Sequence, residues 1–451
     1  MKTDRNILRI AVPSIVSNIT VPLLGLVDTS IAGHLGAPTY IGAIAVGGMF
    51  FNMIYWIFGF LRMGTGGLTA QAYGAGRRDE ADRTLLRSLG LALLAGLALI
   101  ALHQPLAEVF FYLLGPTPEV EALARRYYTI LIWGAPAMLC LYSLIGWFLG
   151  MQNAKFPMFI AITQNVVNIG ASLALVVGAG WKVEGVATGT LIAQYAGLLM
   201  ACALWRRHFG LRLKREAWRA TWDGRALRRF FSVNRDIFFR TLCLVGVSTY
   251  FTASGARQGE LILAVNALLM QFFMLFSYIM DGFAYAGEVL GGRCYGAGDV
   301  AEFRRLTRRL FVWGLGLAGL FTLAYSLGGG LLLGVLTDET SVVRAAETFL
   351  PYAVAIPLTG FAAFLFDGLF IGTTSTRGML LAAGGATAAF FLVECGLTAQ
   401  LGNHALWTAF LLYLLLRGVI QAACYGRVCK KIVHLRKQRE TPGAASASPD
   451  I

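Results

Sequence analysis

Charged side chains inside long apolar segments are the residues of this sequence that could do chemistry. If such a segment crosses a membrane, a charge at its centre costs about 2.5–3.5 kcal/mol, so the residue is a functional candidate by default. A carboxyl group in this setting can take up and release a proton or bind a cation. The candidates are Asp28, Asp236, Arg240, Asp281, Glu288, Asp367 and Glu394.

Asp28 stands out because two prolines precede it in the same apolar segment. Pro13 and Pro22 free backbone carbonyl groups and would create a hinge in a helix. Low dielectric disfavours the charged form of a carboxyl group, so Asp28 could exchange a proton near neutral pH. The alternative is a buried aspartate that hydrogen-bonds Thr or Asn and only fixes packing.

A stripe of polar side chains follows one face of a later apolar segment. Gln164, Asn168 and Ser172 are four residues apart, a spacing that places them on one side of a helix. With Asn165 beside them, they could face Asp28. They could equally be hydrogen-bonding residues that hold two helices together.

Arg240 follows Asp236 by one helical turn, so the two side chains could pair within one helix. Alternatively, Arg240 lines a substrate cavity and holds the charge of another carboxylate. Asp281 and Asp367 are the candidates for that partner, or for a gate.

The composition explains why these charges are exceptional. Of the 451 residues, 57% are hydrophobic and 14% are charged, and the mean hydropathy is +0.64. Soluble domains carry about 25% charged residues, and a soluble protein this apolar would expose larger patches than monomers tolerate. The composition therefore excludes an ordinary soluble enzyme and predicts a protein embedded in the lipid bilayer.

Twelve apolar segments are each near the length of about 20 residues that a helix needs to cross the hydrocarbon core. Backbone groups in lipid must satisfy their own hydrogen bonds, so these segments are predicted to be helices of an all-α polytopic membrane protein. The alternating segments of a β-barrel do not occur in the sequence. The predicted spans are 10–33, 40–62, 86–104, 124–150, 156–180, 184–205, 230–255, 261–289, 308–335, 345–372, 378–401 and 404–426.

Positive charge alternates along the chain in step with these spans. Most Lys and Arg residues fall on one side if the amino terminus is cytoplasmic, as in the groups at 77–87 and 304–309. Basic residues accumulate in cytoplasmic loops, so we expect a multi-pass protein of the plasma (inner) membrane with both termini cytoplasmic. The net charge of +14 then reflects topology, and we expect no nucleic-acid partner.

Two short motifs that recur with the same shift indicate a duplication. Tyr73–Gly76 recurs at Tyr295–Gly298, and Gly146–Gly150 recurs weakly at Gly368–Gly372, in each case 222 residues later. An even number of spans in each half makes the halves parallel repeats, which enclose a central cavity.

The duplication sets the predicted domain boundaries. Residues 1–205 and 230–427 form two pseudo-symmetric six-helix lobes, joined by a basic cytoplasmic linker at 206–229. The tail at 428–451 is polar and rich in Pro, Ala and Ser, and is expected to be disordered. The same shift pairs Arg240 with Asn18. The predicted cavity residues are Asn18, Gln164, Asn165, Arg240, Asp281 and Asp367.

Signatures of nucleotide, metal or covalent chemistry do not occur in the sequence. It has no G-x-x-x-x-G-K-[ST] loop, and the dipeptide Gly-Lys is absent altogether. The five histidines pair with no Cys or Asp at metal-ligand spacing, and the seven cysteines form no C-x-x-C pair. We therefore expect no catalytic residue, no metal and no cofactor, with an ion gradient as the energy source.

A resemblance to a known family runs from about residue 7 to residue 430, and six stretches carry it: Ser17–Leu35, Phe60–Gln71, Asn234–Leu244, Gly255–Glu260, Asp281–Glu288 and Phe366–Gly372. They resemble the multidrug and toxic compound extrusion (MATE) family, and specifically its DinF branch. The resemblance implies twelve helices in two six-helix lobes. It also implies export of bulky, often cationic organic compounds in exchange for H⁺ or Na⁺.

The resemblance implies roles for individual residues as well. The family's cation-responsive aspartate in the first helix matches Asp28, and its asparagine in the fifth helix matches Asn168. The acidic residue that usually lies four positions later is Ser172 here, and Thr190 completes the predicted coupling set. Hard cations prefer several oxygen ligands and anionic charge, so the missing carboxylate disfavours tight Na⁺ binding and favours proton coupling.

The sequence thus predicts a monomeric secondary antiporter that exports small organic cations or drugs in exchange for protons by alternating access. Two alternatives are a Na⁺-coupled multidrug exporter and a flippase for lipid-linked oligosaccharides of the same superfamily. A flippase would need clustered Arg or Lys for a diphosphate, and only Arg240 and Arg62 qualify. An intramembrane enzyme or receptor is a further alternative, but an enzyme would need paired catalytic residues at one membrane face, which the sequence does not offer.

Overall fold

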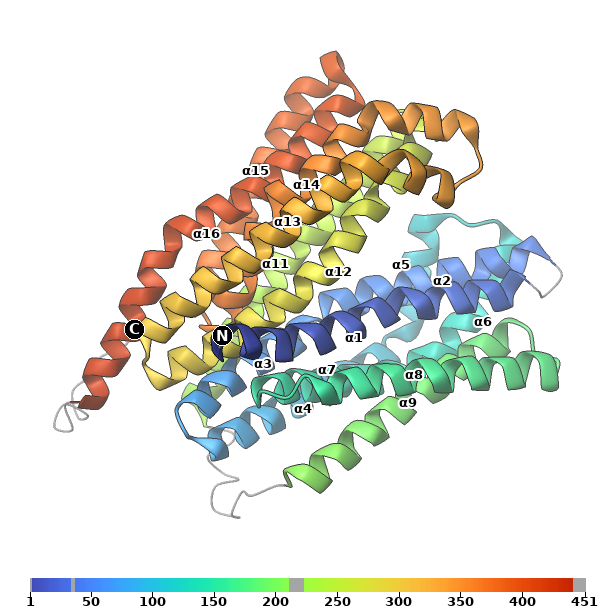
Figure 1. Ribbon diagram of the computed structural model, residues 1–451. Coiled ribbons are helices and arrows are strands. Elements are labelled where there is room, and N and C mark those ends of the chain that lie inside the picture. The colour runs from blue at the N-terminus through green and yellow to red at the C-terminus, as the bar shows by residue number, and fades with distance from the viewer. Residues whose placement is uncertain (1, 34–36, 211–222, 441–451) are drawn as a thin grey trace. The chain divides into compact units, whose positions relative to one another are not determined.

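The protein is built from helices (Figure 1). The computed structural model describes residues 2–33, 37–210 and 223–440, and every regular element in these ranges is helical. A helix satisfies all backbone hydrogen bonds within one segment, which lipid requires of an apolar chain. The predicted all-α fold is therefore confirmed.

Each predicted span coincides with a helical segment, and some of these segments consist of two successive helices, as at Pro38–Gly74 and Pro118–Gly150. Within the described residues, eleven helical segments are long and apolar enough to cross a membrane, and α1 lies over the remaining span, 10–33. The α-helices up to residue 208 are α1 (Lys2–Gly33), α2 (Pro38–Ile57), α3 (Phe60–Gly74), α4 (Arg78–Ala101), α5 (His103–Leu114), α6 (Pro118–Leu131), α7 (Ala135–Gly150), α8 (Lys155–Leu173) and α9 (Val183–His208). The later ones are α11 (Gly224–Arg257), α12 (Glu260–Ala297), α13 (Val300–Leu336), α14 (Thr340–Gly372), α15 (Thr376–Leu401) and α16 (Asn403–Glu440).

Several helices begin at residues that suit a helix start. Pro38 opens α2 and Pro118 opens α6, where a proline loses no intrahelical hydrogen bond. Asp299 caps α13 by accepting a hydrogen bond from the backbone N–H of Glu302 at 2.9 Å. Two short helical turns of other types extend two spans: the 3-10 helix η1 (Ile132–Gly134) joins α6 to α7, and the π-helix η2 (Ala174–Gly178) follows α8.

The described chain divides into two compact units. Unit 1 contains the described residues of Met1–Ile15, Ala70–Gly76 and Arg235–Ile451, and unit 2 contains those of Val16–Thr69 and Arg77–Asn234. Unit 1 thus combines most of the predicted second half with two short segments of the first half. The linker predicted at 206–229 is helical where α9 ends and α11 begins, and its residues 211–222 lie outside the described ranges.

Unit 2 is held together by helix pairs with aromatic side chains between them. Helix α8 packs on α9, α4 on α7 and α2 on α6. Phe50 and Phe51 of α2 pack on the ring of Tyr128 of α6, with centroid distances of 4.8 and 5.7 Å. All three rings are buried, so their apolar area drives this packing.

Unit 1 contains helix crossings that only glycine allows. A methyl group on Gly296 of α12 would lie 2.0 Å from the backbone oxygen of Gln71, and one on Gly74 would lie 2.0 Å from that of Arg293. Gln71 and Gly74 correspond to Arg293 and Gly296 under the 222-residue shift. The recurring Tyr-Gly-Ala-Gly motif therefore makes one reciprocal contact between the ends of α3 and α12.

Backbone geometry confirms the duplication. Gln152 (φ 66°) and Thr374 (φ 48°) are the only described non-glycine residues with positive φ, and they are 222 residues apart. Gly76 (φ 70°) and Gly298 (φ 74°) are related by the same shift. Left-handed backbone is uncommon outside glycine, so chance would not place it at equivalent positions of both halves.

Helix α16 is longer than the sequence pattern predicts. The expected disordered tail at 428–451 is instead helical up to Glu440, and residues 441–451 lie outside the described ranges. Val428, Cys429 and Ile432 are buried and recur at helical spacing. Their packing extends the helix beyond the last membrane span, which the polar composition of the tail obscures.

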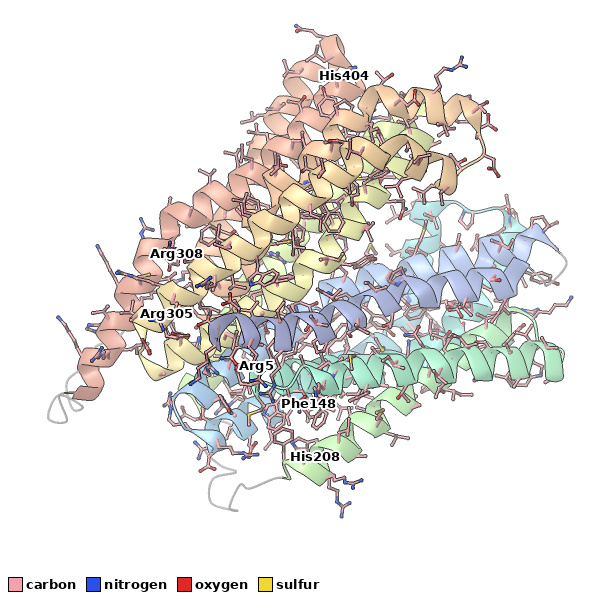
Figure 2. The ribbon with its side chains drawn as sticks, in the orientation of Figure 1. Arg5, Phe148, His208, Arg305, Arg308 and His404 are labelled. Carbon is pink, nitrogen blue, oxygen red and sulfur yellow. The ribbon has the colours of Figure 1, made fainter. Side chains whose placement is uncertain are left out.

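Arginine side chains lie at the end of unit 1 where the predicted topology places basic residues. Figure 2 shows Arg305 and Arg308 near the start of α13 and His404 at the start of α16, at opposite ends of unit 1. Both arginines are exposed. Which end faces the cytoplasm stays a prediction.

Candidate functional site

Asp28 is buried in unit 2 and lacks a counter-ion among the described residues. Asp28 is 7% exposed, and its Oδ1 atom has no hydrogen-bond partner in the described part of the chain. The side chains that interact with its carboxyl group are Asn168 of α8 and Tyr127 of α6. The structure therefore brings together Asp28 and Asn168, as the sequence predicts.

Asn168 links Asp28 to α9. Its Nδ2 atom donates a hydrogen bond to Thr190 Oγ1 at 2.9 Å, and Thr190 donates to the backbone oxygen of Val186 at 2.9 Å. The Oδ1 atom of Asn168 is buried and has no partner in the described ranges. Thr190 thus joins the predicted group through Asn168.

Two buried acceptors without donors define the chemistry of this group. An unmet acceptor inside a protein costs about 1–3 kcal/mol, and more if it carries charge. Asp28 Oδ1 and Asn168 Oδ1 are both in this position. A proton on Asp28 would remove the buried charge and add one O–H donor beside these acceptors. The arrangement is thus suited to proton uptake.

The polar stripe on α8 faces α9. Gln164 contacts the backbone at Gly197, where a methyl group would lie 2.5 Å from its Cγ, and Ser172 lies against Gly189, where a methyl group would lie 2.2 Å from its Oγ. Ser172 Oγ has no hydrogen-bond partner among the described residues. Both side chains therefore pack α8 against α9.

Asn165 and Asn18 are the other predicted cavity residues of unit 2. Asn165 donates from Nδ2 to the backbone oxygen of Ala161 in its own helix at 2.8 Å. Asn18 is half-buried on α1. These placements leave their predicted role in substrate binding as a prediction.

A second buried polar cluster lies in unit 1 around Asp367 of α14. Arg240 of α11 donates from Nη2 to Asp367 Oδ2. Arg417 of α16 donates from Nη2 to the same oxygen at 2.6 Å, and Gln421 donates from Nε2 to Asp367 Oδ1 at 2.5 Å. Arg240 therefore holds the charge of a distant carboxylate, one of the two possibilities derived from the sequence.

The in-helix pair of Arg240 with Asp236 is not formed. Asp236 instead accepts hydrogen bonds from Arg235 Nη2 at 3.1 Å and from Thr376 Oγ1 at 2.9 Å. Both of its oxygens are thus occupied, one of them by α15. Asp281, the other candidate partner, is half-buried on α12 and interacts electrostatically with Arg417.

Sequence reasoning missed Arg417 and Gln421. Arg417 lies inside the predicted span 404–426, so the cost of a charge in a membrane helix was a signal that could have singled it out. Gln421 follows it by one turn, on the same helix face. Neither signal would have identified Asp367 as the shared partner.

The structure also shows hydrogen-bond partners of Glu394 that the sequence did not predict. Glu394 is buried on α15 and accepts hydrogen bonds from Tyr250 Oη at 2.7 Å and Ser254 Oγ at 2.8 Å. The 222-residue shift maps Asp28 onto Tyr250 and Ser172 onto Glu394. The acid of the first half therefore lies on α1, and that of the second half lies on α15, the equivalent of α8.

No metal centre is formed by the described residues. Among them, no three His, Cys, Asp or Glu side chains gather in a group that could hold a metal ion. The buried carboxyl groups of Glu394 and Asp367 are bonded to hydroxyl, amide and guanidinium groups instead.

Comparison with known proteins gives the family. The MatE family model matches residues 13–173 and again 237–391, which together make up more than half of the chain. The DNA damage-inducible protein F of Escherichia coli (strain K12) is 39% identical over 426 residues, covering 94% of this chain and 92% of that protein. The chain belongs to the MATE family. Each half of this MATE protein carries one of the two matches, as the duplication requires.

Further relatives agree with this assignment. The "Probable multidrug resistance protein NorM" of Bradyrhizobium diazoefficiens is 27% identical over 383 residues, covering 80% of this chain and 78% of that protein. A solved MATE structure in the bent conformation aligns with a TM-score of 0.85 over 98% of both chains at 18% identity. An outward-facing multidrug resistance MATE family transporter aligns with a TM-score of 0.84 over 95% of this chain and 96% of its own, also at 18% identity. The protein is thus a multi-pass membrane transporter of the MATE fold and not an enzyme.

Proposed function

We propose that this MATE protein exports amphipathic, often cationic organic compounds in exchange for protons, as a monomer and by alternating access. The observation that carries the proposal is the pair of buried acceptors at Asp28 and Asn168 that lack a donor. A proton arriving at Asp28 removes the buried charge, and its departure restores the charge. The names of the multidrug resistance relatives support organic compounds as the cargo.

Helix α1 is the element through which the charge change would act. Pro13 and Pro22 lie within it, on either side of the point where its residues pass from unit 1 to unit 2. Each proline removes one intrahelical hydrogen bond, which makes bending cheaper than in an unbroken helix. In the proposed cycle, protonation of Asp28 bends α1 and releases the exported compound outside, and loss of the proton to the cytoplasm resets the helix.

The proton gradient supplies enough free energy for this exchange. One charge crossing 100 mV is worth about 2.3 kcal/mol, and one pH unit is worth about 1.4 kcal/mol. Together, about 3.7 kcal/mol per proton would support an expulsion of several hundred-fold for a neutral compound. A monovalent cation exchanged for one proton would be driven by the pH term alone, about tenfold.

Transport in vesicles tests the proposal. The purified protein is reconstituted, and efflux of a fluorescent organic cation is followed under an imposed pH gradient and then under a Na⁺ gradient. We expect the pH gradient alone to drive transport, and Asp28→Asn to abolish it. Asp79→Asn, which removes an exposed carboxylate of α4, is the matched control and should transport normally. Transport driven by Na⁺, or unchanged transport by Asp28→Asn, would contradict the proposal.

The flippase alternative finds less support in the described residues. A lipid diphosphate would need unoccupied guanidinium or ammonium groups in the membrane interior. The buried arginines Arg240 and Arg417 both bind Asp367. Releasing them for a diphosphate would leave Asp367 buried with only Gln421 as a partner.

A further inference from the structure

Asp367 is a buried carboxylate that two guanidinium groups neutralise. Its Oδ2 atom accepts from two guanidinium groups, those of Arg240 and Arg417, and its Oδ1 atom accepts from the Gln421 amide. The side chains of Arg240, Arg417 and Asp367 are 8%, 5% and 8% exposed. Three helices, α11, α14 and α16, therefore meet at one desolvated ion cluster.

The charges of this cluster balance only if Asp281 is included. Two guanidinium groups and one carboxylate would leave a net charge of +1 in the protein interior, which is costly. Asp281 of α12 is half-buried and interacts electrostatically with Arg417. With Asp281 ionised, the four side chains carry no net charge, and each charge has an opposite neighbour fixed to the chain.

The ligands that surround Asp367 are unsuitable for a mobile cation. A Na⁺ ion needs several oxygen atoms with free lone pairs, whereas Asp367 is surrounded by N–H donors from Arg240, Arg417 and Gln421. A proton would have to displace a guanidinium group that is held by a buried, charge-assisted hydrogen bond. Asp28, by contrast, forms no ion pair in the described part of the chain.

We propose that Arg240 and Arg417 act as a built-in counter-ion that prevents Asp367 from exchanging Na⁺ or protons, and so determine the ion specificity of the transporter. This proposal rests on the proposed function, because it confines ion exchange to Asp28. It predicts that a latent cation site exists in unit 1. Removing Arg240 takes one positive charge from the cluster and leaves Asp367 with Arg417 and Gln421 as its partners.

An oxygen atom of the cluster that lacks a hydrogen-bond donor favours such a latent site. Gln421 Oε1 is buried and has no hydrogen-bond partner in the described ranges. Once the Arg240 side chain is shortened, this oxygen and the Asp367 carboxylate would offer acceptors to a cation that enters the vacated volume. Arg240 itself corresponds to the neutral Asn18 in the other half, so the neutralised arrangement is specific to unit 1.

Thermal unfolding of the purified protein tests the proposal without any transport measurement. The Tm is measured in NaCl, in LiCl and in choline chloride at equal ionic strength, at pH 6 and at pH 8. Wild type should show no Na⁺- or Li⁺-selective increase in Tm. Arg240→Gln should gain an increase of roughly 2 °C in Na⁺, in Li⁺ or on acidification, because a ligand that binds only the folded state raises its stability.

Two variants assign the response to the cluster. Arg240→Gln/Asp367→Asn should lose the gained increase, because the Asp367 carboxylate is gone. Arg240→Lys should behave like wild type, because it keeps the positive charge. If Arg240→Gln does not fold, Arg417→Gln removes the other guanidinium group and should give the same response.

Two results would overturn the proposal. One is a folded Arg240→Gln variant whose Tm responds to neither cations nor pH. The other is a Na⁺-selective increase in wild type that persists in Asp28→Asn, since this would place an exchangeable cation outside Asp28. Failure of the proposed function would show differently, as pH-driven transport that survives Asp28→Asn, so the two failures are distinguishable.

Discussion

Replacing Asp367 with Asn should destabilise the protein strongly, and a second substitution should recover much of the loss. Asn cannot balance the two guanidinium groups that donate to Asp367 Oδ2. Breaking a buried ion pair by removing one partner costs about 3–5 kcal/mol, because the remaining charge is left uncompensated. Asp367→Asn leaves Arg240 and Arg417 facing each other at less than one-tenth exposure, which is this situation.

The compensating substitution follows from the charge balance. Adding Arg240→Gln removes the one positive charge that Asp367→Asn leaves uncompensated, and Arg417 keeps Asp281 as its neighbour. The double variant should therefore be more stable than Asp367→Asn alone, with a coupling free energy of about 2–3 kcal/mol, at the upper end of values for residues in one network.

Thermal unfolding in detergent, followed by the fluorescence of a thiol-reactive dye or by circular dichroism, measures both effects. At roughly 2 °C per kcal/mol, we expect Asp367→Asn to lower the Tm by about 5–10 °C and the second substitution to restore about half of that. Asp367→Asn with a Tm within 1 °C of wild type would refute the reasoning. So would a double variant less stable than both single variants.

Two further predictions concern unit 1. Gly296→Ala should lower the Tm, because its methyl group would lie 2.0 Å from the backbone oxygen of Gln71, and overpacking costs about 1–3 kcal/mol. Gly316→Ala is the control and should leave the Tm unchanged, because its methyl group would have no atom within 4 Å. Tyr250→Phe should cost about 1–3 kcal/mol, because it leaves Glu394 Oε2 without its donor. In a Glu394→Gln background the same substitution should cost less, and equal costs in both backgrounds would show that the hydrogen bond contributes nothing.

The helical fold was predictable from the sequence because it follows from local physical constraints. An apolar segment of about 20 residues must be helical in lipid, so the predicted spans coincide with helices along the whole chain. The duplication was predictable from the sequence too. Gly74 and Gly296 belong to a motif that recurs in both halves, because a close helix crossing requires glycine at both positions. The extension of α16 to Glu440 was not predictable from the sequence, since it depends on tertiary packing of Val428, Cys429 and Ile432.

The candidate site was predictable only where one residue type sufficed. Asp28 and Asn168 could be chosen because a carboxyl or amide group is rare in an apolar helix, and the structure places them in contact. The partner of Arg240 could not be chosen, because Asp236 is one turn away in sequence, while Asp367 is 127 residues away. Spacing along a helix gives local neighbours, whereas the contact with α14 is decided by how the helices pack.

The assignment of segments to units shows the same limit. Residues 70–76 form the end of α3 and the turn after it in the first half, yet they pack with unit 1 through the Gln71 side chain. This side chain donates from Nε2 to the backbone oxygen of Gly372 at 2.9 Å and to Thr374 Oγ1 at 3.0 Å. Hydropathy cannot distinguish this packing from packing within the first half.

Proton release on drug binding measures the central claim most directly. A saturating organic cation is added to the detergent-purified protein in weak buffer, and the released protons are counted with a pH-sensitive dye across pH 6–8. We predict that wild type releases protons on binding and that Asp28→Asn releases none while remaining folded. Equal proton release by wild type and Asp28→Asn would contradict the role of Asp28 as the exchanging group.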